Sequence, residues 1–118
     1  MAKALDIAKQ YYDSFSGDGS ILGEILAEDL RFTGAMAQAE NRAEFLELLA
    51  GMGPMVKGIK MYKQFENGEY ISSFYDLRTS TPAGDVPMAE LLRVRKGKIQ
   101  EINLYYDARA FADLPAPQ

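Results

Sequence analysis

The spacing of apolar residues changes at Val56, and this change restricts the possible folds more than any other feature of the chain. Before Val56 they recur about every 3.6 residues, as in helices, and after it apolar and polar residues alternate, as in strands. The alternation predicts four strands, separated by short glycine-containing turns, at 56–65, 70–79, 86–95 and 98–106. Four consecutive strands joined in this way form an antiparallel meander.

The first half of the chain predicts helices. Apolar residues at helical spacing indicate helices at 3–15, at 21–27 and after residue 41, with a short strand at 29–33. Asn41, followed three residues later by Glu44, forms a capping box at the start of the third helix. Helices followed by a meander, with no crossover between parallel strands, predict an α+β fold with an antiparallel sheet.

Length and composition exclude several classes of protein. The chain has 118 residues, 47% of them hydrophobic, which predicts a single domain at 1–113 and a frayed tail at 114–118. It has no Cys and no His, so thiolate nucleophiles, Ser-His pairs and the usual zinc sites are excluded. The formal charge of −4 disfavours nucleic acid as a partner.

Other absences narrow the prediction further. No phosphate-binding glycine motif is present, and a metal site without His would need more converging carboxylates than Asp76 and Glu90, so we expect neither cofactor nor metal. The chain shows no leader-like segment and no apolar run of about 20 residues. We therefore expect a cytoplasmic protein with no membrane partner.

The loop between the second and third strands of the meander predicts a pair of carboxyl groups. The segment from Thr81 to Asp85 fits a three-residue hairpin loop with Gly84 in a left-handed conformation. If Thr81 faces Asp85, then Asp76 faces Glu90, with Cβ atoms about 5 Å apart. On an inward face such a pair would share one proton and provide an acid and a base near neutral pH. Four further residues share this face: Phe74, Arg78, Met88 and Leu92.

The last hairpin adds apolar side chains to this face. A three-residue loop there puts Ile102 opposite Glu90, whereas a two-residue turn puts Asn103 there. We prefer the three-residue loop, because it also brings Leu104 and Tyr106 to the same side.

The sequence leaves open which face of the sheet is inward. The opposite face is at least as apolar, since it carries Ile71, Tyr75, Leu77, Ala89 and Leu91. In the alternative arrangement the carboxyl pair is solvated and bridged by Arg78. A sheet with two apolar faces is commonly covered by helices on one side and by a second copy on the other, so we expect a homodimer.

Two segments resemble the nuclear transport factor 2-like superfamily, which includes ketosteroid isomerase, limonene epoxide hydrolase and the SnoaL-like polyketide cyclases. They are AKQYYDSFSGDGSILGEILAEDLRF and the ending LLRVRKGKIQEINLYYDARAF, so the resemblance extends from Ala8 to Phe111. It implies a cone-shaped α+β fold, in which a strongly curved antiparallel or mixed sheet wraps around N-terminal helices and an apolar pocket. It also implies a homodimer formed through the convex sheet face.

The resemblance implies roles for individual residues as well. Glu90 falls at the isomerase's carboxylic acid, which stays protonated to stabilise an oxyanion, and Asp76 falls near a catalytic aspartate of the epoxide hydrolase. Both assignments place the pair on the concave face. Neither catalytic set is complete, because Gly34 stands at the isomerase's general base and Leu104 at the hydrolase's second aspartate.

We therefore expect a small-molecule pocket protein that is a cofactor-independent acid/base enzyme of the isomerase, cyclase or epoxide hydrolase type, acting on a small apolar substrate. Glu90 would be the protonated acid and Asp76 the base. The residues expected to contact the substrate are Tyr11, Tyr12, Phe74, Arg78, Met88, Leu92, Leu104 and Tyr106. The sequence does not decide which of the adjacent tyrosines faces the pocket. The alternative is a non-catalytic dimeric module of the same fold that binds a ligand or another protein.

Overall fold

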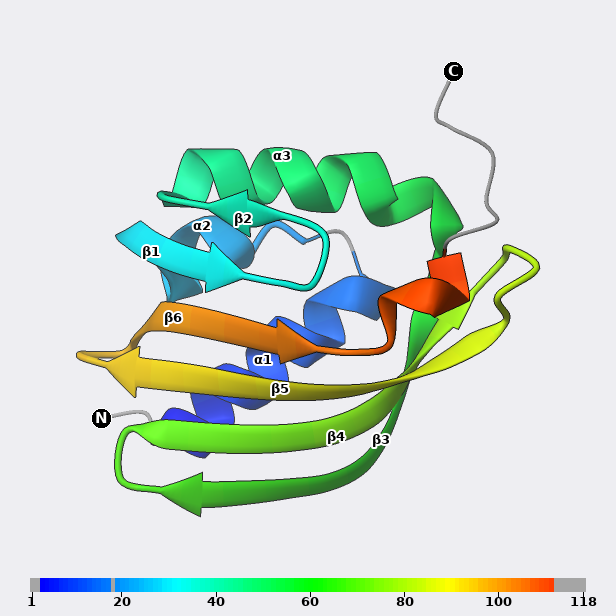
Figure 1. Ribbon diagram of the computed structural model, residues 1–118. Coiled ribbons are helices and arrows are strands. Elements are labelled where there is room, and N and C mark those ends of the chain that lie inside the picture. The colour runs from blue at the N-terminus through cyan, green and yellow to red at the C-terminus, as the bar shows by residue number, and fades with distance from the viewer. Residues whose placement is uncertain (1–2, 18, 112–118) are drawn as a thin grey trace.

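The computed structural model describes residues 3–17 and 19–111, and a curved six-stranded sheet forms most of it (Figure 1). The strands are β1 Leu26–Thr33, β2 Gln38–Ala39, β3 Val56–Asn67, β4 Tyr70–Thr79, β5 Asp85–Arg95 and β6 Lys98–Tyr105, in the sheet order β2-β1-β6-β5-β4-β3. The helices are α1 Ala4–Asp13, α2 Leu22–Ile25 and α3 Arg42–Met52, with 3-10 turns η1 Ser14–Ser16, η2 Gly53–Met55 and η3 Ala108–Phe111. The predicted α+β fold and the four-stranded meander are confirmed.

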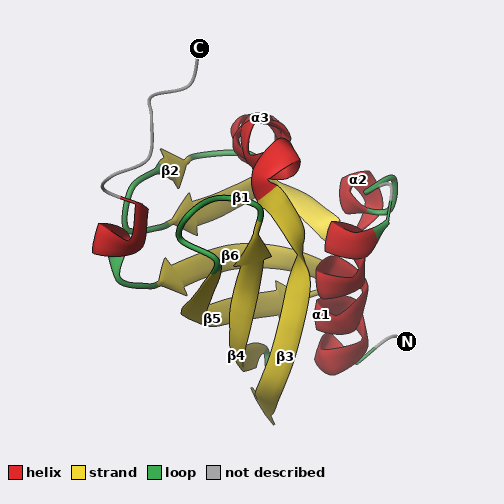
Figure 2. Cartoon of the chain, turned by 90° about the vertical axis from the view of Figure 1, so that its right-hand side faces the viewer, coloured by secondary structure: helices red, strands yellow, loops and turns green. Residues whose placement is uncertain are grey.

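Helix α1 lies against the concave face of the sheet, and α3 lies over β1 and β2 (Figure 2). The backbone N–H of Leu5 donates to Glu66 Oε2 at 3.2 Å, which holds the start of α1 against the end of β3. Helical spacing gathers the buried side chains of α1 on one side: Ile7, Ala8, Tyr11 and Tyr12. The same helix therefore closes the core and presents two tyrosines to the sheet.

The capping box predicted for α3 is present. Asn41 Oδ1 accepts from the backbone N–H of Glu44 at 2.9 Å, and Glu44 Oε1 accepts from the backbone N–H of Glu40 at 2.8 Å. Arg42 donates from Nη1 to the carbonyl of Leu26 at 3.2 Å, which joins the start of α3 to the start of β1. These contacts hold α3 over one end of the sheet.

The sheet is mixed, because β1 pairs with β6 in parallel. Turn residues specify only strands that follow one another in the chain, and α3 and four strands separate β1 from β6. Nothing in the turns therefore indicates this pair, whereas the family resemblance allowed a mixed sheet. Strand β2 has only two residues, too few to show alternation, and was not predicted.

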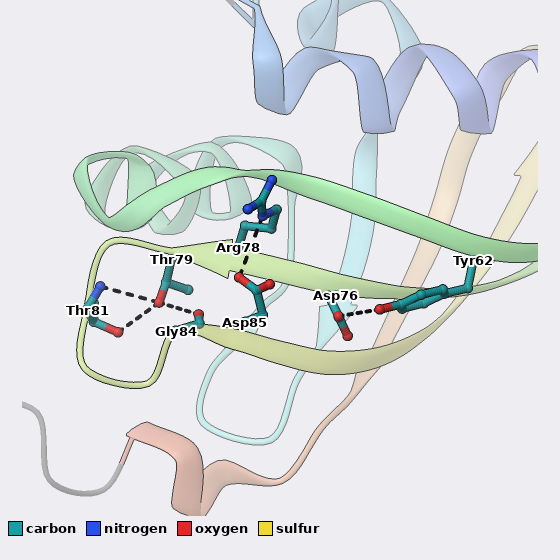
Figure 3. A network of polar contacts seen from close by, with 7 residues as sticks. All are labelled: Tyr62, Asp76, Arg78, Thr79, Thr81, Gly84 and Asp85. Atoms are coloured by element: carbon teal, nitrogen blue, oxygen red, sulfur yellow. Dashed lines mark hydrogen bonds and ion pairs between the residues drawn. The ribbon is translucent and has the colours of Figure 1, made fainter.

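The register predicted for β4 and β5 was wrong. Ser73 pairs with Glu90, and Asp76 pairs with Pro87. The hairpin loop is longer than predicted: the Thr79 N–H donates to the Gly84 carbonyl at 3.1 Å and Thr79 Oγ1 donates to it at 2.7 Å (Figure 3). The pairing is offset by an odd number of residues, and an odd offset moves a strand's side chains to the other face.

The corrected register reverses the two faces of β4. Tyr75 and Leu77, expected on the outer face, are buried in the core, and Met88, Glu90 and Leu92 of β5 face inward as predicted. The predicted inward residues of β4 lie on the convex face instead: Phe74, which is 42% exposed, Asp76 and Arg78. The carboxyl pair of Asp76 and Glu90 does not exist, because the two residues lie on opposite faces.

The last hairpin differs from both arrangements considered. It has a two-residue turn, in which Lys96 and Gly97 have φ values of 55° and 74°, followed by a bulge that shifts the pairing by one residue. The bulge places Leu104 opposite Glu90. Ile102 is nevertheless buried on the inner face, as expected.

Among residues 3–17 and 19–111, no helix is long and apolar enough to cross a membrane. The predicted tail at 114–118 lies outside the described residues. The cytoplasmic location stays a prediction.

Thr79→Val tests whether the threonine hydroxyl determines the length of the β4–β5 loop. Valine keeps the side-chain shape but removes the bonds of Thr79 Oγ1 to the Gly84 carbonyl and to Thr81 Oγ1. We expect the free energy of unfolding, measured by urea denaturation, to fall by about 1 kcal/mol or more. Thr33→Val, at an exposed position of β1, should change it by less than about 0.5 kcal/mol. Equal stabilities of the two variants would contradict this role of Thr79.

Candidate functional site

A cavity of about 390 Å³ lies between α1, α3 and the concave face of the sheet. Its walls are mostly aromatic and aliphatic, and they include Phe15, Phe32 and Phe45. Glu90 lines it together with Tyr11 and Tyr75. Among the described residues that line this central cavity there is no Lys and no Arg, so Glu90 has no positive partner there.

Glu90 is held by two phenols. It is 4% exposed, and its Oε1 accepts from Tyr12 Oη at 2.8 Å and from Tyr75 Oη at 3.1 Å. Tyr12 reaches it from the last turn of α1, and Tyr75 from the neighbouring strand β4. Because both phenols bind the same oxygen, Oε2 is the carboxyl oxygen left for a ligand.

Burial determines the protonation of Glu90. Loss of solvent raises its pKa from 4.5 to about 7, and the hydrogen bonds from Tyr12 and Tyr75 oppose this rise because they stabilise the carboxylate. Burial, and then the negative charge of Glu90, also raise the pKa of Tyr75, so its phenol stays protonated as a donor. Both forms of the carboxyl group are therefore populated near neutral pH.

The hydroxyl of Tyr12 accepts a hydrogen bond from a chain of polar side chains. Gln64 Nε2 donates to Ser73 Oγ at 3.2 Å, and a hydrogen bond from Ser73 lowers the pKa of Tyr12, although burial raises that pKa more strongly. Ser73 is completely buried on the inner face of β4. The chain Gln64, Ser73, Tyr12, Glu90 thus donates in one direction, and it strengthens Tyr12 as a donor to Oε1.

Tyr11 presents the second polar group of the cavity. It is 2% exposed, and its ring stacks on Phe45 with centroids 6.5 Å apart and meets Phe15 edge to face at 5.3 Å. Burial, and then the nearby Glu90, raise the pKa of its phenol. Its hydroxyl makes no hydrogen bond to the residues that the structure describes, and the oxygen is not sealed off from the cavity. The two tyrosines are therefore both inward, Tyr12 toward Glu90 and Tyr11 toward the cavity.

Solved structures of other proteins share this architecture. An NTF2-like protein from Cytophaga hutchinsonii is similar with a TM-score of 0.76 at 20% identity, over 92% of this chain and 94% of its own. A SnoaL-like polyketide cyclase from Jannaschia sp. has a TM-score of 0.81 at 16% identity, over 98% and 93%. A protein with a ketosteroid isomerase-like fold from Catenulispora acidiphila, solved with trimethylamine, has a TM-score of 0.71 at 24% identity, over 86% and 85%.

The chain has the nuclear transport factor 2-like fold. No protein-family model matches it, and no curated protein does. The NTF2-like cone, with helices inside a curved mixed sheet, is the architecture implied by the two segments quoted above. This fold often forms a small-molecule pocket, and the central cavity occupies the inside of this cone.

The NTF2-like cone brings together only part of the predicted site. Met88, Leu104 and Tyr106 line the cavity, and Leu92 is buried on the same face without lining it. The predicted contacts on β4 do not line the cavity: Phe74, Asp76 and Arg78. On the convex face, the Asp76 carboxylate accepts from Tyr62 Oη at 2.5 Å, and Arg78 pairs with Asp85 at 3.6 Å (Figure 3).

Sequence reasoning missed the residues that depend on the β4 register. The predicted register puts Tyr75 on the outer face, and the prediction does not include Ser73. The alternation in 71–77 nevertheless places both residues on one side together with Ile71. A hairpin loop one residue longer would have revealed them. Among the described residues, no group of three or more acidic side chains gathers where a metal ion could be held.

The raised pKa of Glu90 predicts how stability depends on pH. The folded state holds a proton that the unfolded state loses near pH 4.5, so the free energy of unfolding falls as pH rises from about 4.5 through about 7. Glu90→Gln removes this titration, and Gln can still accept from both phenols. We compare the free energy of unfolding of the natural protein with that of Glu90→Gln, measured by urea denaturation at each pH. We expect the difference between these two free energies to change by about 3 kcal/mol across this pH range. Parallel pH profiles would show that Glu90 titrates normally.

Proposed function

We propose that the central cavity binds a small apolar molecule through one oxygen atom and that Glu90 transfers a proton to and from that molecule. The observation that carries this proposal is a carboxyl group buried in an apolar cavity beside the phenol of Tyr11, which makes no hydrogen bond to the described residues. Burial raises the pKa of this carboxyl group to about 7. A general acid or base works best when its pKa is close to the working pH. Apolar walls with a few convergent polar groups are also typical of ligand sites.

The proposed reaction is proton abstraction next to a carbonyl group. The ligand's carbonyl oxygen accepts a hydrogen bond from Tyr11, and the Glu90 carboxylate takes a proton from the neighbouring carbon. The electrons of the broken C–H bond move toward the carbonyl oxygen and form an enolate, which the Tyr11 hydroxyl stabilises. Glu90 then returns the proton to the same carbon or to another one, which gives exchange or isomerisation.

This role differs from the one expected from the sequence, because Asp76 lies outside the cavity. The position of the isomerase's base offers no second carboxyl either: it is Gly34, where a Cβ would lie 2.9 Å from Cζ of Phe32. Glu90 has to act as base and acid in turn. A reaction with one carboxyl group favours an isomerase over an epoxide hydrolase, whose reaction uses two.

Exchange of α-protons tests the proposal without knowledge of the natural substrate. Cyclohexanone and 2-octanone are incubated with the protein in D₂O, and loss of the α-proton signals is followed by NMR. We expect exchange above the buffer rate, reduction to that rate in Glu90→Gln, and a loss of about a hundredfold in Tyr11→Phe.

Asp76→Asn is the matched control, because it changes a carboxyl group on the convex face of the same sheet. It should leave exchange unchanged. Exchange that depends on Asp76, or that survives Glu90→Gln, would overturn the assignment of Glu90. Binding of the ketones without exchange would favour the alternative, a non-catalytic ligand-binding module.

We also propose a homodimer formed through the convex face. Five large side chains are exposed there, from 42% for Phe74 to 62% for Tyr105; the others are Tyr62, Phe65 and Tyr70. Phe65 and Phe74 meet edge to face at 6.2 Å, so they form one continuous apolar surface. A contiguous exposed apolar patch of this kind is typical of a protein interface.

Light scattering at micromolar concentration tests the dimer. We expect the mass of two chains for the natural protein and of one chain for Phe74→Lys, because the lysine puts an unpaired charge in the interface. Glu47→Lys, at an exposed position of α3, should remain a dimer. A single-chain mass for the natural protein would exclude the dimer.

A further inference from the structure

Three polar side chains lie together at one end of the central cavity. At this closed end lie Tyr11, Tyr75 and Glu90, all at most 5% exposed. Two hydroxyl groups of the cavity are already engaged: that of Tyr75 donates to Glu90, and that of Thr79 donates to the Gly84 carbonyl. A third hydroxyl, that of Tyr106, also lines the cavity, but its ring packs against Phe111 with centroids 5.7 Å apart, away from Glu90 at the other end. At the closed end a ligand's polar atom finds its partners in Tyr11 and Glu90.

The residues that line the cavity follow one another along β4. Its inward side chains on β4 are, in order, Tyr75, Leu77 and Thr79. On the neighbouring β5, Met88 pairs with Tyr75, and Glu90 lies two residues farther from the Thr79 end, opposite Ser73. The four residue-to-residue steps from Tyr75 to Thr79 span about 13 Å. Apart from its two ends, the wall along this path is apolar.

The other end of the cavity is more exposed and is lined mostly by methionines. Met36, which is 60% exposed, lies there in the loop between β1 and β2, with Met52, Met55 and Phe111, which are partly exposed. These four residues are here called the rim. Met52 ends α3, Met55 ends η2 and Phe111 ends η3, and these segments and the β1–β2 loop surround one end of the cone (Figure 2). Methionine side chains adapt to apolar ligands of different shape.

We infer that the ligand is an elongated molecule with one oxygen acceptor at its end and an unbranched apolar chain, which enters polar end first and lies along β4 and β5 toward the rim. This inference rests on the proposed function, because it assigns the polar end to Tyr11 and Glu90. The closed end selects the oxygen atom, the apolar wall binds the chain, and the rim methionines tolerate chains that reach solvent.

A homologous series of 2-alkanones, from 2-pentanone to 2-pentadecanone, tests the inference by titration calorimetry. Each additional methylene that packs against the apolar wall should lower the Kd about fourfold. The gain should stop once the chain reaches the rim. Branched isomers of equal carbon number should bind more weakly than the linear ketones.

Met55→Trp fills the rim and leaves the closed end intact. Short ketones should bind to it as to the natural protein, whereas those long enough to reach the rim should lose at least tenfold in affinity. Ala50→Trp, at an exposed position near the end of α3, is the matched control and should bind the whole series normally. If Met55→Trp does not fold, Met52→Trp makes the same test from the last residue of α3.

The outcomes separate this inference from the proposed function. Affinity that is independent of chain length, or absence of binding across the series, overturns the elongated ligand, while exchange of cyclohexanone protons still tests Glu90. If alkyltrimethylammonium ions bind more tightly than ketones of equal length, the inference that the ligand's polar end is an oxygen acceptor is wrong. If chain length matters but Tyr11→Phe and Glu90→Gln bind every ketone normally, the assignment of the polar end is wrong.

Discussion

The burial of one carboxyl group without a positive partner is the constraint on which the rest of this structure depends. A carboxylate placed in an apolar interior costs several kcal/mol unless hydrogen bonds compensate for the lost water. Here the compensation comes from two phenols on one oxygen, at 2.8 and 3.1 Å. Burial raises the pKa of Glu90 and the phenols lower it, and the result lies near 7. A carboxyl group in this balance can change protonation state without a change of fold.

Two adjacent tyrosines of α1 meet different requirements because the sheet curves around the helix. Neighbouring residues of a helix point about 100° apart, so on a flat sheet only one of Tyr11 and Tyr12 would face inward. Both are buried here, at 2% and 6% exposure. Tyr12 completes the hydrogen bonds of Glu90 and Tyr11 keeps its hydroxyl toward the cavity. Curvature therefore allows one helical turn to hold the carboxyl group and to present a donor to a ligand.

Local signals in the sequence predicted the elements, whereas pairing between elements was harder to predict. The alternation after Val56 predicted β3 to β6 within two residues at each end, and Asn41 with Glu44 predicted the start of α3. The face of Asp76 depended on a single loop, and there the Thr79 hydroxyl and the bond from the Ser80 N–H to the Met55 carbonyl select a longer connection than glycine alone indicates. Glu90 was placed inward correctly because its own strand alternates clearly, but its partners Tyr12 and Tyr75 depend on long-range packing.

A single carboxyl group also restricts the geometry of the proposed reaction. When one oxygen removes a proton and the same oxygen returns it, both carbons involved have to lie on the same side of the ligand and within reach of Oε2. Tyr11 holds the carbonyl oxygen, so these carbons are the ones nearest the carbonyl group, at the closed end of the cavity. The apolar body of the ligand then takes no part in the proton transfer. Its contribution is binding energy, which holds the reacting carbons beside Glu90 and lowers the entropic part of the barrier.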